Sequence, residues 1–150
     1  MSTSNENLNS TSKVAIIPLL AALVALVGLG DSIYLTVEHY KNEIPPCSIV
    51  QGCELVLTSP YAEVYGVPLS LLGALAYFIA FALALLTAFG NRSLWKIYGI
   101  QVILMSLFTA WLTYLQAYVI GAFCQFCLLS AATTFTLLLL FIVSKLFRTK

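Results

Sequence analysis

The stretch GAFCQFCLLSAATTFTLLLLFIV, residues 121–143, decides the fold, because it joins a pair of cysteines to a long apolar run. A helix that crosses a bilayer needs about 20 mostly apolar residues, and this stretch supplies them. Cys124 and Cys127 lie at its start, and residues three apart share one face of a helix. The N-terminal end of a helix favours a thiolate over a thiol. The stretch therefore predicts a membrane-spanning helix that begins with a dithiol or disulfide pair.

The composition of the whole chain is that of a membrane protein. Of its 150 residues, 61% are hydrophobic and 9% are charged, whereas soluble domains carry roughly 25% charged residues. Three more apolar runs precede the last one, so we expect an all-α membrane protein, a bundle of four transmembrane helices over about 14–37, 68–89, 96–119 and 122–144. These helices make one domain, residues 14–147, which follows a Ser/Asn-rich segment, residues 1–13, that we expect to be a disordered tail. Nucleic-acid binding is not expected, since the chain has no basic cluster.

One substantial polar loop, residues 38–67, separates the first two apolar runs and holds the other two cysteines. Consecutive prolines stop any helix ahead of Cys47, and Gly52 predicts a turn before Cys53. The two cysteine pairs are therefore carried by a loop and by the start of the last helix.

Two ionisable residues border this loop. Asp31 lies near the far end of the first apolar run, where a charged residue either reaches the membrane interface or is functional. We favour the interfacial interpretation. His39, the only histidine, could serve a proton or metal role, but we favour an ordinary loop residue.

The distribution of positive charge predicts the orientation in the membrane. Four spans place both termini and the connection GNRSLWK, residues 90–96, on the same side. All but one of the Lys and Arg residues lie there, namely Lys13, Arg92, Lys96, Lys145, Arg148 and Lys150. By the positive-inside rule this side is the cytoplasm, and the long loop faces outward across the cytoplasmic membrane. All four cysteines are then on the oxidising side, where disulfides persist.

Two close pairs of cysteines admit three interpretations. The first is a redox relay, in which one pair exchanges with an external thiol protein and the other with a membrane electron acceptor. The second is a zinc site, because four thiolates can complete a tetrahedron. The third is two structural disulfides. We favour the relay, since a thiolate metal site on an oxidising face competes with disulfide formation.

A relay needs an acceptor for two electrons, and the lipid-phase acceptor of that kind is a quinone. It would lie between helices near the start of the fourth helix. Aromatic residues in that region are candidate walls, although each could instead serve helix packing or interfacial anchoring: Phe123, Phe126, Tyr77, Trp111 and Tyr114.

The chain resembles the vitamin K epoxide reductase family in its bacterial form. The matching segments are GLGDSIYLTVEHY at the end of the first helix, PCSIVQGC followed by TS in the loop, GVPLSLLG at the start of the second helix, and FCQFCLLSA at the start of the fourth. The order of the pairs adds specificity, since other quinone-linked disulfide-forming membrane proteins carry Cys-x-x-Cys before the loop pair. The resemblance implies a four-helix bundle around a quinone, with the outer loop as a lid.

The resemblance also implies roles for single residues. Cys124 and Cys127 match the active-site pair, with Cys127 beside the quinone. Cys53 matches the cysteine that bonds to Cys124 during transfer, and Cys47 matches the one that exchanges with the partner. Ser59 matches a residue thought to support the pocket by hydrogen bonding.

The family resemblance implies a thiol:quinone oxidoreductase that reoxidises an extracytoplasmic thioredoxin-like protein and needs no metal. The quinone would be of the menaquinone or ubiquinone type. Animal members carry polar quinone contacts, Asn and Tyr, where this chain has Leu69 and Ala131. Since both contacts are missing here, we favour oxidation of a partner by a plain quinone, and reduction of vitamin K or its epoxide is the alternative. The other alternative is a non-catalytic protein with zinc or structural disulfides. Many bacterial relatives carry a fused thioredoxin-like domain; this chain ends at Lys150, so we expect a separate partner protein.

Overall fold

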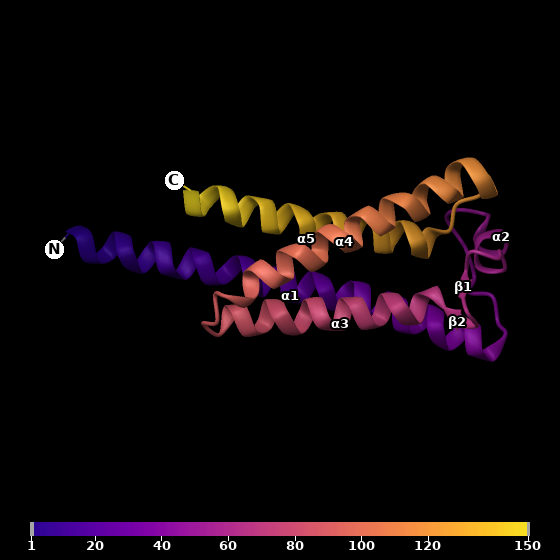
Figure 1. The fold of residues 1–150 in the computed structure, drawn as a ribbon, viewed down its shortest axis with the longest axis horizontal. Coiled ribbons are helices and arrows are strands. Elements are labelled where there is room, and N and C mark those ends of the chain that lie inside the picture. The colour runs from indigo at the N-terminus through magenta and orange to yellow at the C-terminus, as the bar shows by residue number, and fades with distance from the viewer. Residues whose placement is uncertain (1, 150) are drawn as a thin grey trace.

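The computed structural model describes the backbone of residues 2–149 and the side chains of residues 16–149. Its long helices are α1 (Ser2–Lys41), α3 (Leu69–Ala88), α4 (Leu94–Tyr114) and α5 (Gln125–Thr149). They run along the long axis of the molecule, and α4 crosses the bundle obliquely (Figure 1). All four are long and apolar enough to cross a membrane, with α4 extended by the π-helix η1 (Leu115–Ile120). The predicted all-α bundle of four membrane helices is confirmed.

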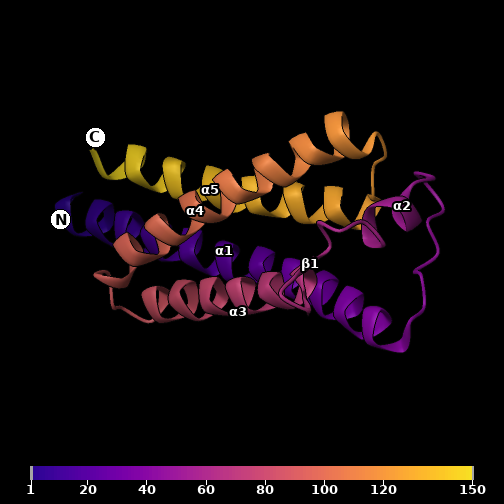
Figure 2. The same cartoon turned by 45° about the vertical axis from the view of Figure 1, so that its right-hand side comes forward.

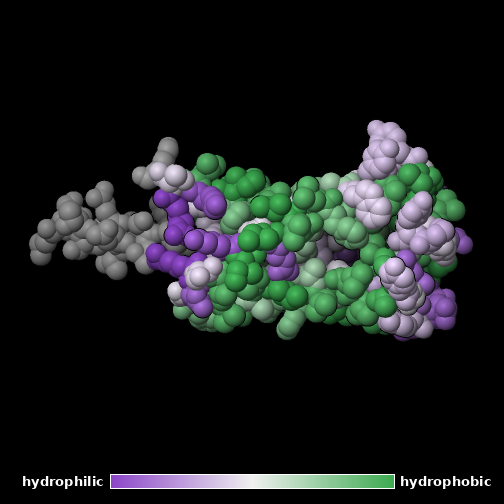
Figure 3. Space-filling model, viewed as in Figure 1, coloured by the Kyte–Doolittle hydropathy of each residue, from purple (hydrophilic) through white to green (hydrophobic). Residues whose placement is uncertain are grey.

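The two ends of the bundle differ. Both chain ends and the turn between α3 and α4 lie at one end, which we call the terminal end (Figure 1). The other end, which we call the loop end, carries the short helix α2 (Cys53–Leu57), also seen in Figure 2, and a hairpin of strands β1 (Glu63–Val64) and β2 (Val67–Pro68) (Figure 1). On the face shown in Figure 3, apolar side chains cover the middle of the molecule and polar ones gather towards the two ends. This distribution suits a protein that spans a bilayer.

The four long helices close into a ring. Helix α1 packs on α3 and α5, and α4 packs on the same two helices from the other side. Small residues let α1 and α3 approach closely, and those in the main buried cluster are Ala21, Ala22, Ala25, Ala80 and Ala84. Gly28 leaves room for the ring of Tyr77, because a Cβ atom there would overlap that ring. The tightly packed part of α1 thus precedes the part that borders the site described below.

Several helix ends differ from those expected from sequence. Helix α1 continues to Lys41, so His39 lies in this helix and not in the loop. Its backbone also includes residues 2–13, which we expected to be a disordered tail, and no glycine or proline interrupts the helix there. Helix α5 covers Gln125–Thr149 instead of about 122–144. The reason is Gly121, whose φ of 70° ends η1 and leaves residues 122–124 as a non-helical link.

Candidate functional site

All four cysteines meet at the loop end. Cys47 and Cys53 form a disulfide, whereas Cys124 and Cys127 carry free thiols. Cys53 and Cys124 are 1% and 0% exposed and belong to one apolar cluster with Val56. Cys47 and Cys127 pack against this cluster. The structure therefore brings together the two pairs that lie far apart in the sequence.

The loop disulfide has an outer and an inner sulfur. Cys47 is partly exposed in the loop, while Cys53 is buried at the start of α2. Cys53 is also the loop cysteine that shares the buried cluster with Cys124. A protein in solution can thus reach Cys47, and Cys53 faces the second pair.

Gly52 permits the close approach of α2 to the second pair. A Cβ atom at this position would lie 2.8 Å from the carbonyl oxygen of Phe123 and 3.2 Å from the Cβ of Ala122. Both neighbours belong to the link that carries Cys124. The absence of a side chain at Gly52 therefore lets Cys53 reach the buried cluster.

We expect Gly52→Ala to slow electron transfer from the loop pair to Cys124 and Cys127 by about tenfold or more, because an added methyl group pushes α2 away from the link. The rate is measured by rapid mixing of the oxidised protein with a dithiol and quenching with an alkylating agent. Gly30→Ala is the matched control, since a Cβ there meets nothing within 4 Å. Equal rates in the two variants would contradict this role of Gly52.

Gln125, which lies between the cysteines of the second pair, ties the loop to α5. The N–H of Ile49 donates to Oε1 of Gln125 at 3.0 Å. The side-chain amide of Gln125 lies 3.5 Å from the carbonyl oxygen of Pro46. These contacts join α5 to both sides of Cys47. Sequence reasoning missed this residue, although its place inside the Cys-x-x-Cys motif was a signal.

Gln116 of η1 holds the link that carries Cys124. The Gln116 side chain is buried, and its Oε1 accepts a hydrogen bond of 3.2 Å from the N–H of Cys124. Its carbonyl oxygen accepts the N–H of Ala122 at 3.1 Å. Two backbone donors of a buried, non-helical segment are thus satisfied by one residue. Nothing in the local sequence distinguishes this glutamine, so sequence reasoning missed it.

We expect Gln116→Leu to lower the free energy of unfolding by about 1–3 kcal/mol, because the buried N–H of Cys124 loses its acceptor. Thermal unfolding in detergent measures the change. Gln116→Glu keeps an oxygen acceptor of the same reach and should lose less. If Gln116→Leu unfolds at the wild-type temperature, the hydrogen bond does not support the link.

The surroundings of Cys124 and Cys127 favour a thiolate at Cys124. Cys124 lies just ahead of the membrane-capable segment Gln125–Thr149. A hydrogen bond from the Cys127 thiol, with the backbone N–H groups of Cys127 and Phe126, lowers the pKa of Cys124 to about 7. Burial acts in the opposite direction but is outweighed. Cys124 is therefore suited to thiol–disulfide exchange, which proceeds through a thiolate.

A cavity of about 730 Å³ opens between the helices below the loop. Of the four cysteines, all of which the structure describes, Cys127 is the one in its wall. Helices α1, α3, α4, η1 and α5 and the loop all contribute to the lining. Its volume lies in the range of about 300–1,000 Å³ that is typical of sites for small molecules.

The candidate wall residues divide into two groups. Ser59 and Tyr77 line the cavity. The others lie outside its lining: Phe123, Phe126, Trp111 and Tyr114. On α4 the cavity is lined by Met105, Phe108, Thr109, Leu112 and Thr113, and Trp111, between them in sequence, is 51% exposed on another face. Phe126 instead packs on the ring of Tyr34, with centroids 5.5 Å apart. The aromatic character of a residue does not indicate whether it lies on the helix face that borders the cavity.

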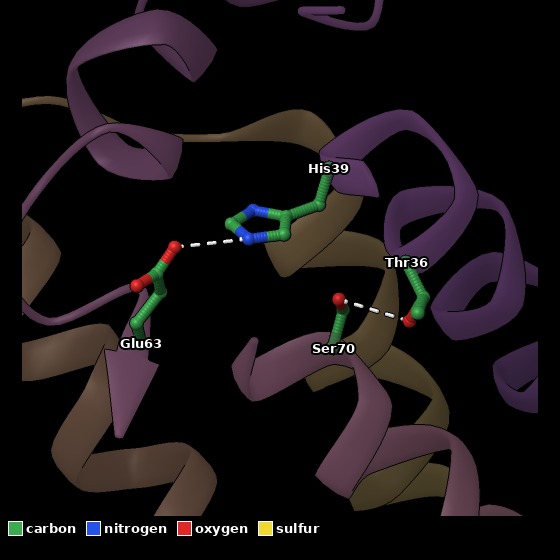
Figure 4. Close-up of polar contacts among 4 residues, drawn as sticks. All are labelled: Thr36, His39, Glu63 and Ser70. Atoms are coloured by element: carbon green, nitrogen blue, oxygen red, sulfur yellow. Dashed lines mark hydrogen bonds and ion pairs between the residues drawn. The ribbon is translucent and has the colours of Figure 1, made fainter. Parts of the chain in front are cut away.

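Two side-chain contacts join α1 to its neighbours at the loop end (Figure 4). His39 Nε2 of α1 lies 2.9 Å from Glu63 Oε1 of β1. Thr36 Oγ1 donates to Ser70 Oγ of α3 at 3.0 Å. His39, Glu63 and Ser70 all line the cavity, so the contact between His39 and Glu63 fastens the hairpin over it. Among the described residues no group of three or more His, Cys, Asp and Glu side chains is arranged to hold a metal ion.

Comparison with known proteins identifies the family of the chain. Residues 19–142 match the Vitamin K epoxide reductase family. The chain belongs to this family. It is also 32% identical over 119 residues to the "Thiol-disulfide oxidoreductase LTO1" of Arabidopsis thaliana. That match covers 73% of this chain and 32% of the relative, so the chain spans about a third of the plant protein's length.

This member of the vitamin K epoxide reductase family is a multi-pass membrane protein, as its four apolar helices indicate. Of the two positions that the sequence comparison singled out, Leu69 lines the cavity and Ala131 is buried. Hydroxyl groups lie one residue away from each, because Ser70 and Ser130 both line the cavity. The cavity therefore has polar groups on α3 and α5.

Proposed function

We propose that this protein is a thiol:quinone oxidoreductase of the cytoplasmic membrane. It reoxidises a separate, extracytoplasmic, thioredoxin-like thiol oxidase and passes the electrons to a menaquinone- or ubiquinone-type quinone. One observation carries the proposal. Cys53 and Cys124, one from each cysteine pair, share a buried cluster, while Cys47 is partly exposed and Cys127 lines the cavity. The four sulfurs thus form a series from solvent to cavity.

The first half of the reaction is a thiol–disulfide exchange. A thiolate of the partner attacks Cys47, the Cys47–Cys53 bond breaks, and Cys53 leaves as a thiolate. The second thiol of the partner then resolves the mixed disulfide, which releases an oxidised partner and a reduced loop pair. Two electrons have moved from the partner to Cys47 and Cys53.

The second half moves these electrons inward. Cys53 attacks Cys124 of a Cys124–Cys127 disulfide, and Cys127 leaves as a thiolate at the cavity wall. Cys47 then attacks Cys53, which restores the loop disulfide and frees Cys124. When Cys124 and Cys127 re-form their disulfide, two electrons and two protons pass to the quinone and give the quinol.

The charges of the chain support the proposed orientation. Positive side chains lie at the terminal end, namely Arg92, Lys96, Lys145 and Arg148. The loop end carries Glu43, Glu54 and Glu63. By the positive-inside rule the terminal end faces the cytoplasm and the cysteines face outward. The printed name of the plant relative, a thiol-disulfide oxidoreductase, supports the reaction class.

The purified protein in lipid nanodiscs should reduce a soluble quinone analogue under anaerobic conditions with dithiothreitol as the electron donor. Cys124→Ser should not do so, because the second pair can no longer form a disulfide. The absorbance of the quinone measures the rate. Lack of turnover by the wild-type protein, with zinc bound to it, would overturn the proposal in favour of a metal site.

A further inference from the structure

Asp31 is an acidic side chain inside the membrane-capable part of α1, and it lines the cavity. Its Oδ2 atom is fully buried and has no hydrogen-bond partner among the described residues. Ten residues separate it from the end of α1, a distance of about 15 Å along a helix. Asp31 therefore does not lie at the end of its helix, and besides the interfacial interpretation favoured from sequence its place in the cavity wall supports the functional one. A buried acidic group without a partner in such a segment indicates a functional site.

Two residues with hydroxyl groups, Tyr77 and Ser130, line the same cavity as Asp31 and Cys127. The ring of Tyr77 packs on Gly28, which lies three residues before Asp31 and so on the same face of α1. The Tyr77 hydroxyl lies 2.8 Å from both the carbonyl oxygen and Oγ of Ser130. Ser130 in turn follows Cys127 by three residues on α5. Side chains of α1, α3 and α5 thus form a polar strip along one cavity.

The position of Asp31 differs from that of the other ionisable groups in this wall. His39 and Glu63 are paired with each other at the loop end, and Glu43 is exposed there, as is Tyr61. The remaining ionisable residues in this wall are Tyr77 on α3 and Cys127 on α5. Reduction of a quinone by two electrons requires two protons. Of the acids in the wall, Asp31 is the one that lies within a membrane-capable helix away from the loop.

We propose that Asp31 is the proton donor to the quinone oxygen; this inference rests on the proposed function. As Cys124 and Cys127 form their disulfide, Asp31 gives its proton to one oxygen of the acceptor. The Asp31 carboxylate then regains a proton released by the two thiols, through the hydroxyls of Ser130 and Tyr77. The proton of the other thiol goes to the second quinone oxygen, so two thiols and one quinone give one disulfide and one quinol, and Asp31 returns to its starting state.

The test compares Asp31→Asn and Asp31→Glu with the wild-type protein in nanodiscs. Each protein is reduced, freed of reductant, and mixed anaerobically with a soluble quinone analogue in a stopped-flow instrument from pH 5.5 to 8.5. We expect Asp31→Asn to be slower by about 100-fold, a typical loss for a general acid. Asp31→Glu should recover most of the rate. The ratio of the wild-type rate to the Asp31→Asn rate should fall as the pH rises, because deprotonation removes the donor only from the wild type.

Two controls separate this role from a structural one. Reduction of the Cys47–Cys53 disulfide by dithiothreitol without quinone should be unchanged in Asp31→Asn. Glu38→Gln removes a carboxylate two turns further along α1. Glu38 lies outside the cavity lining, 3.6 Å from the ammonium group of Lys41, so this variant should react like the wild type. Wild-type rates in Asp31→Asn, or a slow Asp31→Glu with a flat pH ratio, would overturn the inference. If the wild type itself reduces no quinone, the proposed function fails instead.

Discussion

Cys127→Ser is expected to reduce quinone about 1,000-fold more slowly than the wild-type protein, or not at all. Cys127 is the cysteine in the cavity wall, and its partner Cys124 is completely buried. Serine has nearly the same size as cysteine, so the fold and the cavity persist. A hydroxyl cannot form a disulfide, however, and the two electrons of the pair cannot leave. The rate is measured anaerobically with dithiothreitol and a soluble quinone analogue.

The same variant should show where the relay stops. In Cys127→Ser the thiolate of Cys124 attacks the buried sulfur of Cys53 and Cys47 leaves as a thiolate. Alkylation of the partly exposed Cys47 then prevents it from reversing the step. A Cys53–Cys124 disulfide should accumulate and be found by mass spectrometry of peptides prepared without reductant. Cys124→Ser is the control, because it cannot form this bond. A Cys127→Ser protein that reduces quinone, or one with no Cys53–Cys124 bond, would contradict the proposed order of transfer.

Cys47→Ser is expected to lose turnover with a reduced thioredoxin-like protein by about 100-fold or more, while keeping most turnover with dithiothreitol. Cys47 is the partly exposed sulfur of the loop pair, so a folded protein can attack it. Cys53 is buried, which makes it inaccessible to a partner of that size. In this variant Cys53 still forms a disulfide with Cys124, and a small dithiol can reduce that disulfide. Parallel assays with the two donors and one quinone analogue measure the difference.

Ser48→Ala is the matched control for Cys47→Ser, because Ser48 is an exposed neighbour in the same loop. It should keep the wild-type rate with both donors. An equal loss of both activities in Cys47→Ser would show that Cys47 supports the loop instead of receiving the partner. That outcome would remove the assigned division of roles within the loop pair.

The fold could be predicted from sequence because a bilayer demands long apolar helices, and four runs of the chain meet that demand. The ends of the helices were harder. Local turn chemistry decides them, as at Gly121, where a left-handed conformation delays the start of α5. Helix α1 exceeds its apolar run because the polar residues up to Lys41 still extend the helix, and His39 thereby lies opposite Glu63.

Spacing picks out the four cysteines that the structure brings together at the loop end, but not the other residues around them. Membrane helices are apolar on all sides, so their pattern does not indicate which face borders a cavity. Trp111 was expected in the wall for this reason, whereas Phe108 and Leu112 line it. Gln116 accepts a hydrogen bond from the backbone of Cys124, eight residues later, and Gln125 accepts one from the backbone of Ile49 in the loop. Only the folded arrangement brings those partners together.

The proposed relay through Cys127 is tested most directly by counting the quinol formed from fully reduced protein. The chain has four cysteines, so the reduced protein holds electrons for two quinols if both pairs drain through Cys127. After removal of reductant and anaerobic mixing with excess quinone analogue, we predict two quinols for each wild-type molecule. Cys47→Ser combined with Cys53→Ser should give one, and Cys127→Ser should give none. One quinol from the wild type, or any stoichiometric yield from Cys127→Ser, would contradict the relay.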